Sequence, residues 1–199
     1  MELILASGSE RRRAIMSSCG YDFTVIKPDA DESSIVETDP ARLVERLSLL
    51  KASAVRDALP PERRESAVVL GSDTVVTLGE KILGKPRDAK DAVRMLRMES
   101  GNTNVVVTGV ALLVPDGRGG VTEYAASDRT AVRFAGLDDD EIETYVSSGD
   151  PLDKAGAYGI QGPFSVFIER VEGSFSTVVG LPVHLVYRML KAVGITPHF

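Results

Sequence analysis

Short apolar runs alternate with longer amphipathic segments along the chain, a pattern typical of α/β proteins. Residues 2–6 are apolar after Glu2 and predict a buried strand. Ser9 is a good N-cap for a helix that ends near Cys19, because Gly20 follows. In the first half of the chain we expect strands at residues 2–6, 23–26 and 67–76, a loop at 27–34, and helices at residues 10–19, from Pro40, and between Asp88 and Gly101.

The helix that Pro40 opens is the longest of the expected helices. Leu43, Leu47, Leu50 and Ala54 recur at helical spacing and share one face. We therefore expect these four side chains to pack against the core.

The second half of the chain contains more strand-like than helix-like segments. This excess predicts a mixed sheet rather than a purely parallel one, and the meander-like part is expected to form a second lobe. The expected elements are strands at 104–114, 121–134 and 166–171, helices at 138–147 and 182–193, and a glycine-rich loop at 151–163.

Length, charge and cysteine count narrow the class of protein. A chain of 199 residues fits one large domain or two small lobes around a cleft. The net charge of −6 argues against a general nucleic-acid or membrane binder. The single cysteine, Cys19, excludes an internal disulfide, and the chain shows neither a signal peptide nor a transmembrane run. We expect a cytoplasmic protein with no nucleic-acid partner and no membrane partner.

A turn of small residues, 7–9, leads from the first strand into a helix that begins with Arg11, Arg12 and Arg13. Free backbone N–H groups at a helix N-terminus favour an anion, whereas three arginines there oppose the helix dipole. A bound phosphate would reverse the sign of that interaction. The pattern therefore favours a phosphate site over the alternative, a solvated basic face.

Asp73 interrupts an otherwise apolar strand in the sequence Gly71-Ser72-Asp73-Thr74. A carboxylate in such a run must be paired, bound to metal or catalytic, because burying it alone is expensive. This makes Asp73 the best single candidate for a catalytic residue. The acidic loop at residues 29–32 can supply further oxygen ligands, so the two segments together predict a Mg²⁺ or Mn²⁺ site.

Two lysines occupy positions that suit phosphate contacts. Lys51 lies at the margin of the apolar face of the long helix, although snorkelling to solvent explains the same pattern. Lys85 ends a stretch, residues 79–86, that nearly spells a P-loop. Pro86 replaces the hydroxyl residue of that motif and disfavours a helix start, so we reject a P-loop and retain Lys85 as a phosphate contact.

The loop at residues 151–162 combines many glycines and alanines with Asp153, Lys154, Tyr158 and Gln161. Small residues at this density suggest that the backbone closely approaches a ligand. An irregular surface loop is an equally good interpretation of the composition.

Taken in order, these segments resemble the Maf family of nucleoside triphosphate pyrophosphatases, also called septum formation inhibitor proteins. The similarity covers nearly the whole chain. The matching stretches are Leu3 to Arg12, Asp31-Glu32, Lys51-Ala52, Gly71 to Thr74, Leu83 to Pro86, Met95-Leu96 with Ser100-Gly101, Asp153 to Gly162, and Val178 to Pro182.

The resemblance implies a single α/β domain over residues 1–199, with an elongated mixed sheet, flanking helices and two lobes around a central cleft. It also implies hydrolysis of a nucleoside triphosphate at the α-phosphorus with a divalent cation, and a homodimer. We expect the metal at Glu32 and Asp73. By motif position, Asp73 corresponds to the proton acceptor, Arg11, Thr74 and Gln161 to positions linked to substrate choice, and Ser7, Arg12, Glu32, Lys51 and Lys85 to the polar cleft.

The loop from Asp153 to Gly162, which contains Gln161, resembles the branch of the family that acts on dTTP and UTP. The same reaction on 7-methyl-GTP or a modified nucleotide remains an alternative, as does a non-catalytic nucleotide-binding regulator of cell division. The chain departs from the family at Glu10, where proline is usual, and at Ser72, where alanine is usual. Glu10 places a negative charge near the expected phosphate turn.

Overall fold

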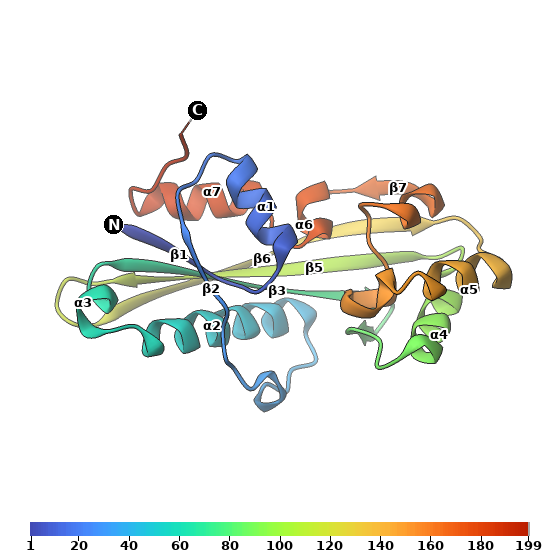
Figure 1. Cartoon of the computed structure of the whole chain (residues 1–199), viewed down its shortest axis with the longest axis horizontal. Helices are drawn as coiled ribbons and strands as arrows, with labels where there is room; N and C mark the ends of the chain where they lie inside the picture. The colour runs from blue at the N-terminus through green and yellow to red at the C-terminus, as the bar shows by residue number, and fades with distance from the viewer. Residues whose placement is uncertain (199) are drawn as a thin grey trace. The chain divides into compact units, whose positions relative to one another are not determined.

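A seven-stranded sheet in the order β2-β1-β3-β5-β6-β7, with β4 paired to β3, organises the chain (Figure 1). The computed structural model describes residues 1–198. The strands are β1 (Glu2–Ala6), β2 (Thr24–Ile26), β3 (Ala67–Leu78), β4 (Lys81–Leu83), β5 (Thr103–Pro115), β6 (Val121–Phe134) and β7 (Ile168–Glu172). The helices are α1 (Glu10–Ser18), α2 (Pro40–Ala58), α3 (Pro61–Arg64), α4 (Ala89–Glu99), α5 (Asp139–Ser147), α6 (Phe175–Val179) and α7 (Val183–Ala192). The predicted mixed α/β fold is confirmed.

The chain divides into two compact, discontinuous units. The first unit comprises Met1–Asp73, Thr108–Asp128 and the segment from Gly180 onward, and the second comprises Thr74–Val107 and Arg129–Val179. Strands β3, β5 and β6 each continue from one unit into the other. The single domain expected for residues 1–199 stays a prediction.

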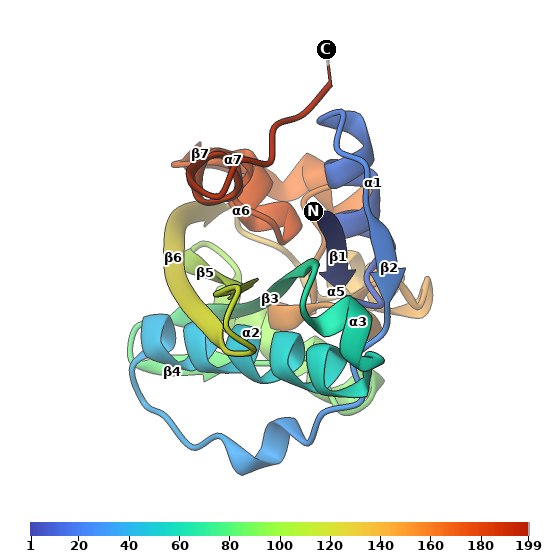
Figure 2. The same cartoon turned by 90° about the vertical axis from the view of Figure 1, so that its left-hand side faces the viewer.

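In the first unit, β1 is paired in parallel with both β2 and β3. Alternate side chains of β1 enter two different hydrophobic clusters, Leu3 and Leu5 on one face and Ile4 and Ala6 on the other. Helices α1 and α7 cover the first face and α2 covers the second, as both views show (Figures 1 and 2). Strands β1 and β3 are therefore buried on both faces, which explains their continuous apolar runs.

The face that α2 buries differs from the predicted one. Of the four residues expected there, only Leu47 is buried, and Leu43, Leu50 and Ala54 are half-buried. The buried stripe consists of Val44, Leu47, Ser48, Ala52 and Val55. Small residues face the sheet because the helix backbone lies directly on two strand glycines.

Gly71 of β3 is one of those two glycines, and we expect Gly71→Ala to destabilise the protein by about 1–3 kcal/mol. A Cβ at position 71 would lie 2.1 Å from the carbonyl oxygen of Ser48, so α2 must move. Urea unfolding measures the effect. Gly136→Ala is the matched control, because a Cβ there meets nothing within 4 Å. Equal losses in the two variants would contradict this packing.

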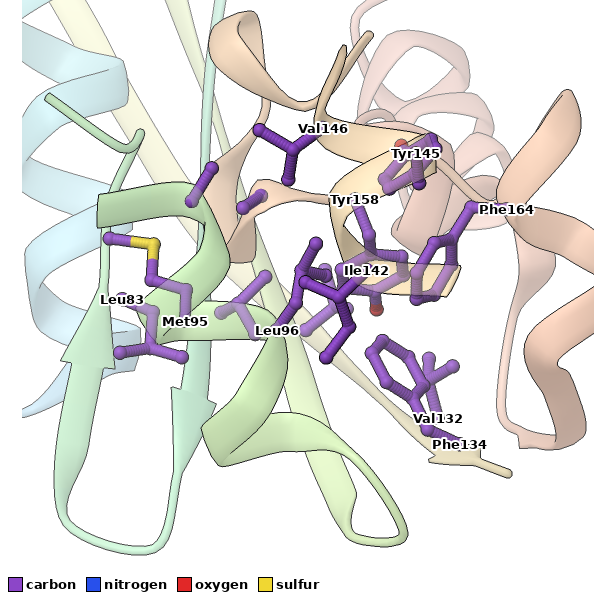
Figure 3. Packing of buried hydrophobic residues seen from close by; sticks show 14 residues of the cluster. Leu83, Met95, Leu96, Val132, Phe134, Ile142, Tyr145, Val146, Tyr158 and Phe164 are labelled. Atoms are coloured by element: carbon purple, nitrogen blue, oxygen red, sulfur yellow. The ribbon is translucent and has the colours of Figure 1, made fainter. Parts of the chain in front are cut away.

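The core of the second unit is built around aromatic rings (Figure 3). Phe164 is fully buried, and its ring centroid lies 4.9 Å from those of Phe134 and Tyr145. Aliphatic side chains from α4 and α5 complete this cluster, among them Met95, Leu96, Ile142 and Val146.

A carboxyl group, Glu99, lies completely buried at the end of α4. Its Oε1 accepts a hydrogen bond of 2.9 Å from Nδ2 of Asn104, and its Oε2 has no hydrogen-bond partner among residues 1–198. Burial raises the pKa of Glu99 well above its ordinary value, and the hydrogen bond from Asn104 lowers it by a smaller amount. The folded protein therefore favours the neutral carboxylic acid.

Because the pKa of Glu99 is higher in the folded than in the unfolded state, stability should fall as the pH rises from about 4.5, its unfolded value, through its folded value. Glu99→Gln removes this proton linkage. We expect the Tm of Glu99→Gln, relative to the unsubstituted protein, to increase as the pH is raised from about 4.5 toward about 8. Thermal unfolding across this range is the test, and parallel curves for the two proteins would contradict it.

Local capping signals placed most helix ends correctly. Ser9 and Asp88 cap α1 and α4 as predicted. Asp138, expected as the first residue of its helix, is the N-cap of α5 and forms a capping box with Glu141. The pattern missed the short helices α3 and α6. Most of the expected loop at 151–163 is taken up by two 3₁₀ turns, Asp150–Asp153 and Ala155–Ala157, and a third, Pro163–Phe167, begins at its last residue. The expected loop at 27–34 contains one further 3₁₀ turn, Glu32–Ser34.

Candidate active site

The turn after β1 has the predicted strand–turn–helix geometry. The Ser7 side chain is buried, and its Oγ accepts a hydrogen bond of 3.1 Å from the backbone N–H of Ser9. Ser9 in turn caps α1 by accepting from the N–H of Arg12. Parallel register places this turn level with the segment that follows Gly71 in β3. The carboxyl ends of parallel strands at such a change of strand order commonly form ligand sites in α/β proteins.

Gly180 fixes two of the polar residues at this edge. Its carbonyl oxygen accepts hydrogen bonds from Nε of Arg12, at 2.7 Å, and from Oγ of Ser72, at 3.3 Å. Ser72 also donates to the carbonyl of Gly109, at 2.8 Å. Gly180 has φ of +118°, a conformation that favours glycine. The serine hydroxyl at position 72 thus anchors the backbone next to Asp73.

Lys51 joins two carboxylates. Its Nζ lies 2.5 Å from Oδ1 of Asp73 and 3.1 Å from Oε2 of Glu32. Asp73 is 9% exposed, whereas the side chain of Glu32 is about half-exposed. Asp73 therefore has the cationic partner that its apolar surroundings require.

Arg12 shares the electrostatic environment of these carboxylates. Burial lowers the pKa of Arg12 from its ordinary value, and so does the neighbouring Arg11, whereas the negative charges of Asp73 and Glu32 raise it. Two arginines, a lysine and two carboxylates thus lie within one region of the first unit. Arginine side chains form strong, charge-assisted hydrogen bonds with phosphate oxygens, so this region suits a phosphate chain.

The negative charge of Glu10 is compensated by an ion pair within α1. Its carboxylate forms an ion pair with Arg13 one turn later, and both side chains are largely exposed. The negative charge that the sequence places near the phosphate turn is therefore compensated on the surface of α1.

The remaining predicted site residues, Thr74, Lys85 and Gln161, belong to the second unit. Lys85 and Gln161 are exposed and Thr74 is half-buried. The segments that carry Lys85 and Gln161 are joined by a hydrogen bond of 3.1 Å from the N–H of Gly156 to the carbonyl of Gly84.

The side chain of Lys154, in the same loop, forms ion pairs within the protein. Its Nζ donates to Oδ1 of Asp150 at 3.0 Å and to Oδ1 of Asp153 at 2.7 Å. Asp150 also accepts a hydrogen bond of 2.6 Å from the hydroxyl of Tyr145. These contacts tie the loop to α5.

Sequence reasoning missed two residues at this edge of the first unit. The carbonyl of Gly180 carries no side-chain signal, so only the fold could reveal it. The aliphatic part of Lys27 lies against the phosphate turn, with Cγ 3.4 Å from where a Cβ of Gly8 would be. Its position directly after β2 and before Pro28 was an available signal, because parallel strand ends meet.

The predicted metal ligands Glu32 and Asp73 both contact the Lys51 ammonium group, so a position between them already suits a cation. Within residues 1–198, no three or more His, Cys, Asp or Glu side chains gather in an arrangement suited to a metal ion. Nor does that part of the chain include a helix with the length and apolar character needed to cross a membrane.

Fold and site together define an α/β protein with a polar, arginine-rich site at the carboxyl ends of parallel strands. Comparison with known proteins identifies the family: residues 2–193 match the family model described as Maf-like protein. The chain belongs to the Maf family.

Curated relatives match over almost their full lengths. A dTTP/UTP pyrophosphatase of Deinococcus radiodurans is 45% identical over 98% of this chain and 94% of its own, and one of Symbiobacterium thermophilum is 44% identical over 97% and 94%. Among solved structures, the Staphylococcus aureus Ham1 protein is similar with a TM-score of 0.54 at 17% identity, covering 97% of this chain and 100% of that one. That likeness supports the fold alone.

Proposed function

We propose that this protein hydrolyses dTTP and UTP to the nucleoside monophosphate and pyrophosphate, by attack of water at the α-phosphorus. The observation that carries the proposal is the buried Asp73, paired with Lys51 beside a basic strand–turn–helix phosphate site. The family supports the reaction, and the names of the relatives support the two substrates.

In this proposal the first unit binds the phosphate chain. The backbone turn that Ser7 closes presents N–H groups at the start of α1, which favour an anion. Arg11, Arg12 and Lys51 contribute positive charge that stabilises the leaving pyrophosphate. Concentrating these cations in one region lets a protein of net charge −6 bind a polyanion.

Asp73 is proposed to orient and deprotonate the attacking water. Its Oδ1 accepts a hydrogen bond of 2.5 Å from Nζ of Lys51. An oxygen fixed in this way can accept a proton from water while the lysine keeps the carboxylate in place.

The residues also fit a divalent cation. Mg²⁺ sites of phosphate-processing enzymes commonly use one or two carboxylates and complete their ligands with substrate oxygens and water. Glu32 and Asp73 are proposed to hold the ion, which when bound would lower the pKa of water and neutralise phosphate charge. Mg²⁺ and Mn²⁺ both suit these oxygen ligands.

Recognition of the base is assigned to Gln161, Thr74 and Arg11. A side-chain amide can donate to and accept from a pyrimidine edge, which supports Gln161 as a specificity residue with Thr74 and Arg11. Lys85 is proposed as a phosphate contact. A nucleotide substrate and the single cysteine support a cytoplasmic location, and the homodimer stays a prediction.

Hydrolysis in H₂¹⁸O tests the site of attack. Attack at the α-phosphorus places the label in UMP and none in pyrophosphate, which mass spectrometry of both products detects. Label in pyrophosphate would show attack at the β-phosphorus, and label in inorganic phosphate would show attack at the γ-phosphorus. Either result would refute the proposed reaction.

A further inference from the structure

A chain of hydrogen bonds links the buried Glu99 to the loop that carries Gln161. The hydroxyl of Tyr158 donates to Oδ1 of Asn104 at 3.1 Å, and Nδ2 of Asn104 donates to Oε1 of Glu99 at 2.9 Å. Glu99 and Asn104 are 0% and 1% exposed. All members of the chain belong to the second unit, and none has a part in the proposed chemistry.

A carboxyl group at position 99 is costly as a core residue. It shares the buried face of α4 with Ala92, Met95 and Leu96, where an apolar side chain would fill the same space without desolvating a polar group. Glu99 accepts a hydrogen bond from the amide nitrogen of Asn104, which leaves the amide oxygen of Asn104 to accept from Tyr158.

The loop beside Tyr158 is held in a strained conformation. Ala157 has φ of +59° and is the only non-glycine residue with positive φ within residues 1–198. The left-handed conformation costs about 1–2 kcal/mol for a residue with a Cβ. Such strain persists only where the surroundings fix the backbone, and it is frequent at functional sites.

Contacts on both sides of Ala157 supply that constraint. The ring of Tyr158 packs edge-on against Phe134, with centroids 4.7 Å apart, and also against Phe164 (Figure 3). The N–H of Gly159 donates to the hydroxyl of Tyr145 at 3.2 Å. The hydrogen bond from the Tyr158 hydroxyl to Asn104 further restrains the orientation of the Tyr158 ring. Gln161 follows three residues later in the chain.

We propose that Glu99 and Asn104 are positioning residues that act through Tyr158 to hold residues 156–161, and with them Gln161, in the conformation that recognises the nucleotide base. This inference rests on the proposed function for the part that Gln161 plays.

Kinetics of matched variants test the proposal. Tyr158→Phe removes only the hydroxyl, and Glu99→Leu replaces the carboxyl group, and with it the acceptor for Asn104, by an apolar side chain of similar size. For both we expect KM for dTTP and UTP to rise about three- to tenfold, the equivalent of one lost hydrogen bond, with kcat nearly unchanged. The preference for UTP over CTP should fall. The conservative variant Glu99→Gln keeps the acceptor oxygen and should restore the original KM.

The double variant Glu99→Leu/Tyr158→Phe distinguishes two explanations of the increase in KM, loss of one connected hydrogen-bond chain and two independent packing defects. If the residues act through one chain, the double variant should raise KM no more than either single variant. Two independent packing defects would instead raise KM by the product of the two single increases. All assays are run well below the lowest Tm of the set, so that lost stability alone does not alter KM.

Hydrogen exchange provides a readout that does not depend on activity. The amides of residues 157–161 should exchange faster in Tyr158→Phe and Glu99→Leu than in the unsubstituted protein, while those of α2 stay unchanged. Unchanged exchange and unchanged KM in both variants would overturn the positioning role. Failure of the proposed function is distinguishable, because the unsubstituted protein itself would then not hydrolyse dTTP or UTP.

Discussion

Asp73→Asn should lower kcat for dTTP and UTP by about 10²- to 10⁴-fold, the usual contribution of a general base. Asparagine has the same size and its amide oxygen still accepts from Lys51, but it cannot take a proton from water. Glu32 continues to pair with Lys51, so the fold should be retained. At saturating metal, KM should change far less than kcat, because the arginines that bind the phosphate chain are unaltered.

Steady-state kinetics measure this effect, with circular dichroism as the check on folding. Asp57→Asn is the matched control, because Asp57 is an exposed carboxylate of α2 in the same unit. We expect the control to keep the original kcat. A folded Asp73→Asn variant with near-normal turnover would remove Asp73 from the mechanism.

Among the variants proposed for this protein, Phe164→Ala should lower the free energy of unfolding most, by about 3–5 kcal/mol. The ring is fully buried and lies at the centre of the aromatic cluster, with ring centroids of Phe134, Tyr145, Tyr158 and Phe167 within 5.4 Å. Truncation removes all of these contacts at once and leaves a cavity that the rigid neighbours cannot close.

Urea unfolding monitored by circular dichroism gives the change in free energy of unfolding. Phe175→Ala is the matched control, because that ring is 52% exposed and its loss should cost less than about 0.5 kcal/mol. Similar losses in the two variants would show that the aromatic cluster does not dominate the stability of the second unit.

Features that depend on neighbouring residues could be predicted from sequence. The bounds of β1 and β6 match the expected ones, and Asp88 and Asp138 mark helix starts because each side chain bonds to a backbone N–H three residues on. The mixed sheet likewise followed from the order of strand-like and helix-like segments.

Features that depend on distant residues could not be predicted. The predicted buried face of α2 was wrong because the hydrophobic pattern favours large residues. In the structure, Gly71 and Gly109 allow the helix backbone to lie close to the sheet, and this favours the small residues Ser48 and Ala52 on the buried face. Hydrophobic periodicity contains no information on which strand a helix will meet.

The candidate site shows the same division. An aspartate inside an apolar strand required a partner, and Asp73 has one, but nothing in the sequence identified Lys51 as that partner. Glu99 was missed although its signal was present, since it falls on the apolar face of α4. A charged residue at a core position of a helix is the pattern to look for.

The most direct test of the central claim is release of pyrophosphate from dTTP, UTP, CTP, GTP, 7-methyl-GTP and ATP, with Mg²⁺ or Mn²⁺ and after chelation. We predict rapid release from dTTP and UTP, with the monophosphate formed in equal amount, and its loss when the metal is chelated. A strong preference for 7-methyl-GTP would contradict the assignment of the substrates. No release from any of the six by the folded protein would contradict the hydrolase and favour a nucleotide-binding regulator.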